Sequence, residues 1–226
     1  MGPIHGFHEV KGLIGLEMSR DSRRTTPAPL TGVVLAGGKK RIGELHPALL
    51  PFGRELMVNR QFRLMKPLCS ELILVTDEPR LFLPVLNSNV RMITDFYTGA
   101  GPLGGIHAAL SLSGNAQVWL AGCDMPFLSS AAAKLMLDRI VKHRLDAVIP
   151  AIDDHLYPLH GIFDRQHVDL LSELAASGRS SVQDYLDRIR YDKLMEWNFQ
   201  RRGIDPKFVV RANTREAYED ALRSIR

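Results

Sequence analysis

The sequence is poor in cysteine and has no long apolar runs. Its 226 residues include two cysteines, Cys69 and Cys123, which are too few for a disulfide framework or a cysteine-based zinc cluster. No apolar run reaches the about 18 residues that a membrane-spanning helix needs. Residues 1–30 lack the basic start, apolar middle and small-residue cleavage site of a signal peptide. We therefore expect a cytoplasmic protein that is not embedded in a membrane.

Aromatic residues and charge of one sign are also scarce. Only 7% of the chain is aromatic, and the formal net charge is +4. Basic residues are scattered, apart from short groups such as Lys39-Lys40-Arg41 and Arg201-Arg202. A nucleic-acid-binding protein normally carries a denser basic stripe with interleaved aromatic side chains, so no nucleic-acid partner is expected. Hydrophobic residues make up 45% of the chain, which is enough for a packed core.

The chain divides into an irregular leader, residues 1–30, and one domain, residues 31–226, in which short apolar segments alternate with helical patterns. Continuous apolar strands separated by helices are typical of a parallel sheet covered on both faces. We predict a single-domain α/β protein with a doubly wound, mostly parallel, Rossmann-like sheet. The expected strands are residues 32–35, 72–76, 90–93, 118–123, 147–149, 158–163 and 208–210, and the expected helices are 56–68, 81–86, 104–112, 130–142, 168–176, a short one after Ser181, and 215–225.

In such sheets ligands bind beyond the carboxyl ends of the strands, so the residues that follow each strand are the candidate site. The first strand is followed by Gly37, Gly38, Lys39, Lys40 and Arg41. Two glycines allow backbone N–H groups to approach an anion, and the adjacent cations would neutralise it. The segment matches neither the dinucleotide-binding pattern nor the Walker pattern, and a glycine turn with a solvated basic tip is the alternative.

Carboxylates follow two further strands. Asp95 comes after the third strand and precedes the glycine-rich segment 99–105, which could shape a pocket for a ribose or a base. Asp124 follows the most apolar strand, where it suits a hard cation such as Mg²⁺, which takes one or two carboxylates plus phosphate oxygens. Either aspartate could instead only stabilise its turn, and Cys123 is expected to be a core residue. Together the three strand ends indicate a nucleoside triphosphate site that uses one metal ion.

At these residues the sequence resembles the molybdenum cofactor guanylyltransferases, also called molybdopterin-guanine dinucleotide biosynthesis protein A, of the nucleotidyltransferase superfamily. The resemblance rests on six segments in family order, which read LAGG, ALLPFG, ILVTDEP, GPLGGIHAAL, GCDMPF and ANTREAYEDA. It implies transfer of GMP from GTP–Mg²⁺ to the terminal phosphate of molybdopterin with release of pyrophosphate. It also implies contact with proteins that deliver or insert the finished cofactor.

The resemblance also implies roles for individual residues. Asp124 would bind Mg²⁺ and act in catalysis together with Lys39 and Arg41. Nucleotide and pterin binding would involve Leu35, Ala36, Gly37, Gly38, Lys40, Asp77, Asp95, Gly101, Pro102, Leu103, Gly104 and Asn213.

The sequence departs from the family pattern at three places. His46-Pro47 replaces an Asp-Lys pair whose lysine helps to bind the nucleotide, and proline supplies neither charge nor an N–H donor. Lys39 or Lys40 could substitute for that lysine from the glycine loop, residues 37–41. Asp77 and Arg211 each stand where the family has asparagine, and Arg211 could pair with the pterin phosphate or block the site. The alternatives are a nucleotidyltransferase with another nucleotide or acceptor, and a non-catalytic relative that binds nucleotide.

Overall fold

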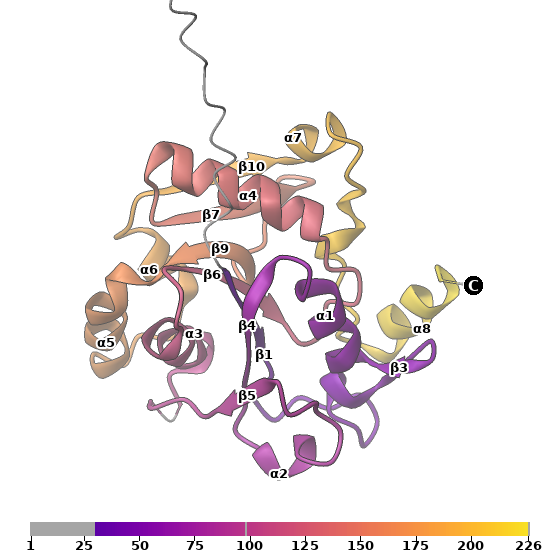
Figure 1. The fold of residues 1–226 in the computed structure, drawn as a ribbon. Helices are drawn as coiled ribbons and strands as arrows, with labels where there is room; N and C mark the ends of the chain where they lie inside the picture. Colours follow the sequence, from indigo (N-terminus) through magenta and orange to yellow (C-terminus); the bar gives the residue numbers. More distant parts are fainter. Residues whose placement is uncertain (1–29, 98, 226) are drawn as a thin grey trace, which may run out of the picture.

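The computed structural model describes residues 30–97 and 99–225 of the chain. Its centre is an eight-stranded sheet with the strand order β10-β7-β9-β6-β1-β4-β5, to which β8 adds by pairing with β7 (Figure 1). The strands are β1 (Leu30–Leu35), β4 (Cys69–Val75), β5 (Val90–Ile93), β6 (Gln117–Gly122), β7 (Ala147–Ile152), β8 (His155–Leu156), β9 (His160–Asp164) and β10 (Tyr191–Met195).

The sheet is mostly parallel, as predicted. β1 pairs in parallel with both β4 and β6, and β5 continues the parallel set beyond β4. β9 runs antiparallel to β6 and β7, while β10 is again parallel to β7. The predicted α/β class and doubly wound arrangement are confirmed. The reversal at β9 brings the amino-terminal end of that strand to the edge of the sheet where β1 and β6 end.

Helices cover both faces of the sheet, and each face has its own apolar core. One core joins the sheet to α1 and α4 and includes Val58, Phe62 and Met136. The other joins it to α3, α5 and α6, which lie together on one side of the molecule in Figure 1, and includes Leu103 and Leu171. The helices are α1 (Met57–Met65), α2 (Pro79–Phe82), α3 (Gly101–Leu112), α4 (Ser130–His143), α5 (Val168–Ala176), α6 (Val182–Leu186), α7 (Glu196–Gln200) and α8 (Arg215–Arg223), with short 3₁₀ turns η1 (Pro47–Leu49), η2 (Arg165–His167) and η3 (Pro206–Val209).

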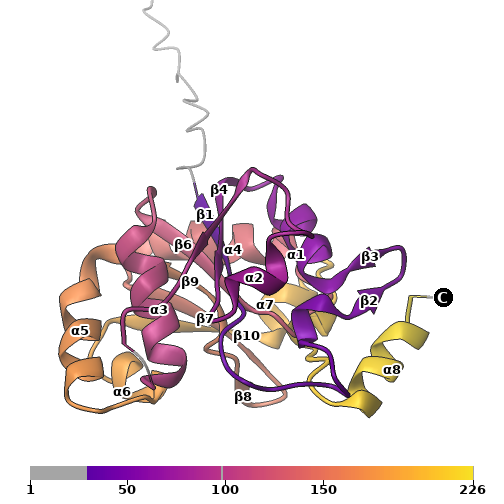
Figure 2. The same cartoon turned by 90° about the horizontal axis from the view of Figure 1, so that it is seen from below.

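The C-terminal helix packs away from the sheet, against a small hairpin formed by β2 (Pro51–Phe52) and β3 (Glu55–Leu56) (Figure 2). Phe52 of the hairpin, Met57 at the start of α1 and Ala221 of α8 form one buried apolar cluster. The hydroxyl of Thr214 caps α8 by accepting a hydrogen bond from the Ala217 N–H at 3.1 Å. The end of the chain is therefore tied to the segment that follows the glycine loop.

Most predicted elements are present, and the largest error lies in the C-terminal third. Residues 208–210 were expected to form the last strand, but Pro206–Val209 is a 3₁₀ turn because Pro206 and the Asp205 cap start a turn there. The edge strand is β10, which the sequence analysis missed along with α7. Helix α3 begins three residues earlier than predicted, at Gly101, and α2 begins two residues earlier, at Pro79.

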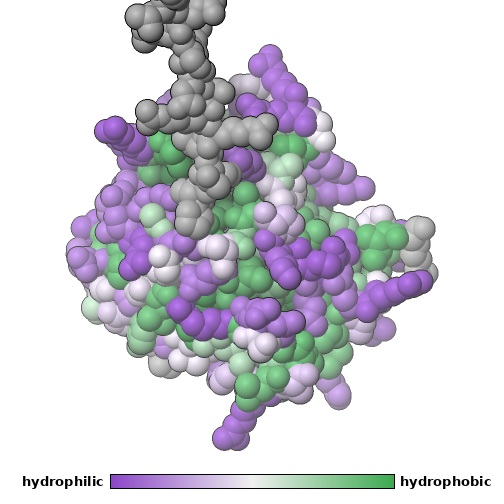
Figure 3. Space-filling model, in the orientation of Figure 1, coloured by the Kyte–Doolittle hydropathy of each residue, from purple (hydrophilic) through white to green (hydrophobic). Residues whose placement is uncertain are grey.

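The domain boundaries need one adjustment. Leu30 was assigned to the leader, but it is a fully buried residue of β1. The remainder of the leader, residues 1–29, lies outside the described residues. Among the helices of the described chain, none has the length and apolar character to cross a bilayer. Figure 3 shows hydrophilic side chains spread over one face of the molecule, with apolar areas between them.

Candidate functional site

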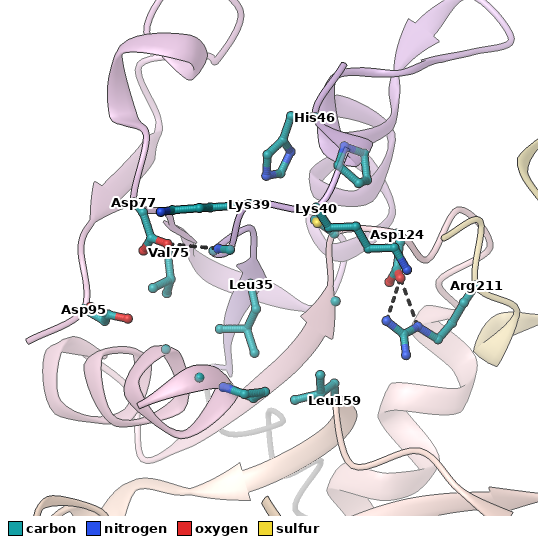
Figure 4. Close-up of a pocket in the computed structure, with 18 of the residues that line it drawn as sticks. Leu35, Lys39, Lys40, His46, Val75, Asp77, Asp95, Asp124, Leu159 and Arg211 are labelled. Carbon is teal, nitrogen blue, oxygen red and sulfur yellow. Dashed lines mark hydrogen bonds and ion pairs between the residues drawn. The ribbon is translucent and has the colours of Figure 1, made fainter. Parts of the chain in front are cut away.

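A cavity of about 640 Å³ opens at the carboxyl ends of the central parallel strands (Figure 4). Hydrogen bonds beyond the strands keep these ends together. The Ala36 N–H donates to the Val75 carbonyl at 2.8 Å, and the Cys123 N–H donates to the Leu35 carbonyl at 3.0 Å. The loops that follow β1, β4 and β6 therefore start from a fixed frame, and their side chains converge on one space.

Ten of the predicted site residues line this cavity. They are Leu35, Gly37, Gly38, Lys39, Lys40, Asp77, Asp95, Gly101, Pro102 and Asp124.

The glycine loop after β1 is held by a carboxylate. The Gly38 N–H donates to the Asp77 Oδ2 atom at 2.9 Å, as the dashed line in Figure 4 shows. Gly38 has a φ of +90°, a conformation that favours glycine. Asp77, which stands where the family pattern has asparagine, thus fixes the turn from which the two lysines project.

The two lysines of this loop point in opposite directions. In Figure 4 the side chain of Lys39 extends toward Asp77, whereas that of Lys40 extends toward Asp124. Both residues line the cavity. The loop therefore supplies one cation to each side of the space, and the cation beside Asp124 comes from Lys40.

The wall next to β5 combines Asp95 with the start of α3. A Cβ atom at Gly104 would lie 3.0 Å from the Asp95 Oδ2 atom and 3.1 Å from the Tyr97 carbonyl oxygen, so this position favours glycine. Burial, reinforced by the negative charge of Asp77, raises the pKa of Asp95 above its usual value. Gly101 and Pro102 open α3 at the cavity, where the first turn of the helix can offer backbone N–H donors to a ligand.

Asp124 is nearly buried on the opposite side, with 6% of its surface exposed. Its turn is fixed from α1, because the Gln61 Nε2 group donates to the carbonyls of Gly122 at 2.7 Å and Met125 at 3.0 Å. The main chain of Asp124 also accepts a hydrogen bond from the Ala212 N–H at 2.7 Å. Helix α1 and the C-terminal segment, residues 210–214 between η3 and α8, thus position this carboxylate together.

Arg211 already pairs with Asp124. Its Nε and Nη2 atoms both donate to the Asp124 Oδ2 atom, at 3.0 and 2.7 Å (Figure 4). The Arg211 side chain is 45% exposed and that of Asp124 is 8% exposed. The sequence left two roles open for Arg211, which could block the site or bind a phosphate. Its pairing with Asp124 shows how it would block the site.

His46 and Pro47, which replace the Asp-Lys pair, form part of the cavity wall. The His46 Nδ1 atom accepts a hydrogen bond from the Ala48 N–H at 3.1 Å, which places Pro47 at the start of η1. Burial and the nearby Arg41 charge lower the pKa of His46, so the ring is neutral at pH 7. This segment contributes shape to the site and no positive charge.

The remaining predicted residues do not line the cavity. Leu103 is fully buried in the core, and Ala36 and Gly104 are packed behind the wall. Arg41 turns away to form an ion pair with Glu78. Asn213 is not among the lining residues either, although its neighbour Ala212 is bonded to Asp124.

Sequence reasoning missed several residues that shape the site. Gln61 had a visible signal, because it is a polar residue at an apolar position of a predicted helix. Leu159 had no such signal. It lies at the cavity because β9, which it precedes, runs antiparallel to β6 and so begins at the edge of the sheet where β6 ends. Cys123 also lines the cavity, and burial raises its pKa to about 12, so it is a thiol with no nucleophilic role at pH 7.

Comparisons with known proteins agree on one family. A family model described as the MobA-like NTP transferase domain matches residues 32–192. The chain is 28% identical over 200 residues to the molybdenum cofactor guanylyltransferase of Desulfosudis oleivorans, covering 87% of this chain and 96% of the relative. It is 31% identical over 172 residues to the probable molybdenum cofactor guanylyltransferase of Pelotomaculum thermopropionicum, covering 75% and 80%.

Among solved structures, the molybdopterin-guanine dinucleotide biosynthesis protein A from Archaeoglobus fulgidus has a similar fold. The TM-score is 0.70 at 22% sequence identity, with 86% of this chain and 98% of the other covered. At this level of identity the likeness concerns the fold.

Proposed function

Because this chain belongs to the MobA-like NTP transferase family, we propose that it transfers GMP from GTP to the terminal phosphate of molybdopterin. An oxygen of the acceptor phosphate forms a bond to the α-phosphorus of GTP, the bond from that phosphorus to the bridging oxygen breaks, and pyrophosphate leaves. The acceptor phosphate is ionised at neutral pH, so the reaction needs no nucleophilic side chain. The observation that carries the proposal is the cavity at the strand ends, which joins a glycine loop, two lysines and Asp124.

The two sides of the cavity suggest how the nucleotide lies. The glycine loop, the start of α3 and Asp95 form one side and suit the nucleoside, because they offer backbone donors and a carboxylate that can accept hydroxyl or amino hydrogens. Lys40 and Asp124 form the other side and suit the phosphates. Lys40 would neutralise phosphate charge at the reacting centre, which is the main task of the protein in this chemistry.

The surroundings of Asp124 fit a magnesium ion. Its carboxylate is nearly buried at the cavity wall, and the residues described contain no group of three or more His, Cys, Asp or Glu side chains that would form a complete cage. Mg²⁺ accepts such a site because it keeps several waters and takes phosphate oxygens as ligands. When bound, Mg²⁺ would supply positive charge to the phosphate groups. Asp124 would hold it.

The proposed cellular location rests on the sequence, and the proposed partner proteins rest on the nature of the product. The scarcity of cysteine favours a cytoplasmic location. The finished dinucleotide has to be passed on, so cofactor delivery or insertion proteins are the partners that we propose.

The test is a transfer assay with purified protein, GTP, Mg²⁺ and molybdopterin, in which chromatography measures the dinucleotide. We expect GTP-dependent product, its loss in Asp124→Ala, and near-normal rates in the matched control Asp138→Ala, which removes an exposed carboxylate of α4. Product from CTP in preference to GTP would favour the related nucleotidyltransferase. Nucleotide binding without any product would favour the non-catalytic relative, and near-normal transfer by Asp124→Ala would show that a metal ion is held elsewhere.

A further inference from the structure

The ion pair between Arg211 and Asp124 joins the proposed metal ligand to a second cation. Both guanidinium hydrogen bonds reach the same oxygen, Oδ2, at 3.0 and 2.7 Å. A divalent cation bound to that oxygen would lie within a few ångströms of the guanidinium carbon, where two positive charges repel each other strongly. Arg211 and a metal ion therefore compete for the Oδ2 atom of Asp124.

The two partners differ in their freedom to move. Asp124 is nearly buried and its turn is held by Gln61, whereas 45% of the Arg211 side chain is exposed. The main chain beside Arg211 is fixed, because the Ala212 N–H donates to the Asp124 carbonyl at 2.7 Å. The guanidinium can consequently leave Asp124 by side-chain rotation alone, and it then remains at the mouth of the same cavity.

We propose that Arg211 occupies the cation position on Asp124 in the free protein, gives way to the divalent cation when nucleotide binds, and then pairs with a substrate phosphate. This inference rests on the proposed function for the identity of the nucleotide. Its physical basis is that a metal ion alone must displace the guanidinium without compensation. A metal–nucleotide complex brings phosphate oxygens that accept the released arginine in a charge-assisted hydrogen bond. Nucleotide and metal therefore bind cooperatively, and Arg211 is a positioning residue for both.

The experiment measures Mn²⁺ binding to the full-length protein by electron paramagnetic resonance, first without nucleotide. We expect Arg211→Ala to bind Mn²⁺ about tenfold more tightly than the natural protein, since a partly desolvated ion pair no longer has to be broken. With saturating GTP the advantage shrinks or reverses, because the arginine is no longer available to the phosphates. Arg211→Gln, which retains most of the side-chain volume, is expected to behave like Arg211→Ala.

Two controls separate this role from a structural one. Arg188→Ala removes an arginine that pairs with Glu173 on the surface, and it should leave Mn²⁺ affinity unchanged. In the Asp124→Asn background, Arg211→Ala should lose its effect on Mn²⁺ affinity. If Arg211 only anchored the C-terminal segment, both Arg211 variants would lower the melting temperature and leave Mn²⁺ affinity as it is.

The outcomes also separate the inference from the proposed function. Equal Mn²⁺ affinity of the natural protein and both Arg211 variants, with GTP-dependent transfer intact, overturns the inference and leaves the function in place. Tighter Mn²⁺ binding by the variants, together with no transfer from GTP by the natural protein, supports the competition at Asp124 and overturns the guanylyltransferase assignment.

Discussion

Replacement of Gln61 by methionine tests whether helix α1 fixes the turn that carries Asp124. Gln61 is fully buried, and its amide nitrogen donates to the carbonyls of Gly122 and Met125, one on each side of Asp124. Methionine has a similar length and volume, so the variant removes the donor without opening a large cavity. The Met125 carbonyl would then lose its Gln61 donor, whereas the Gly122 carbonyl keeps the Met125 N–H as a donor at 3.3 Å.

The expected loss of stability follows from these two hydrogen bonds. A buried acceptor left without its donor costs about 1–3 kcal/mol. Within the described residues the Gln61 Oε1 atom has no hydrogen-bond partner. Removing that buried oxygen stabilises the folded protein and offsets part of the loss of stability. We therefore expect Gln61→Met to lower the free energy of unfolding by about 1–3 kcal/mol. The affinity of the folded variant for Mn²⁺ should also fall, because the turn is free to shift.

The assay is urea denaturation at pH 7 with the slope of each transition fitted separately, so that a change in stability is distinguished from a change in the unfolded state. Gln200→Met is the matched control, because the exposed side chain of Gln200 donates to the Glu196 carboxylate on the surface of α7, and its effect should stay within about 0.5 kcal/mol. If Gln61→Met were as stable as Gln200→Met, α1 would not determine the position of Asp124.

Three further predictions follow from the cavity and the core. Lys40→Ala should weaken GTP binding at least about tenfold in a nucleotide titration. Lys39→Ala should weaken it less, because of these two lysines only Lys40 points toward Asp124. Equal losses of GTP affinity would show that the direction of the two side chains does not matter for binding. Pro47→Lys restores the lysine of the family pattern at the cavity wall and should raise GTP affinity and transfer rate, and unchanged kinetics would show that its charge is already replaced. Burial lowers the pKa of His160 to about 3, so the unfolded chain binds the extra proton below pH 6.5 and stability falls by up to about 1.4 kcal/mol per pH unit on acidification. His160→Leu should remove this contribution, so the pH dependence of stability in urea denaturation between pH 5 and 6.5 becomes shallower, and a slope identical to that of the natural protein would contradict the prediction.

Local patterns were sufficient to predict the half of the sheet that positions the loops of the candidate site. The strands β1, β4, β5 and β6 are mostly apolar and bounded by turns, and parallel pairing places their carboxyl ends at one edge, so Gly38, Asp95 and Asp124 could be assigned to one site in advance. Asp77 was included only through the family resemblance. The other half was harder because its strands do not follow that rule. β9 reverses direction, and β10 contains Asp192 and Lys193, so it lacks a continuous apolar run.

The pairing of Arg211 with Asp124 could not be predicted, because it depends on the path of an irregular segment that separates η3 from α8. That pairing also links two departures from the family pattern, the proline at position 47 and the arginine at position 211. The cavity is lined by three cations, Lys39, Lys40 and Arg211, and by three carboxylates, Asp77, Asp95 and Asp124, so its formal charge is balanced even though Pro47 carries none. With proline at position 47, the positive charges that line the cavity come from the glycine loop and from Arg211. In the role that we propose for Arg211, a triphosphate pairs with this arginine only after Asp124 has gained another cation, and the metal ion and the nucleotide then depend on each other for binding.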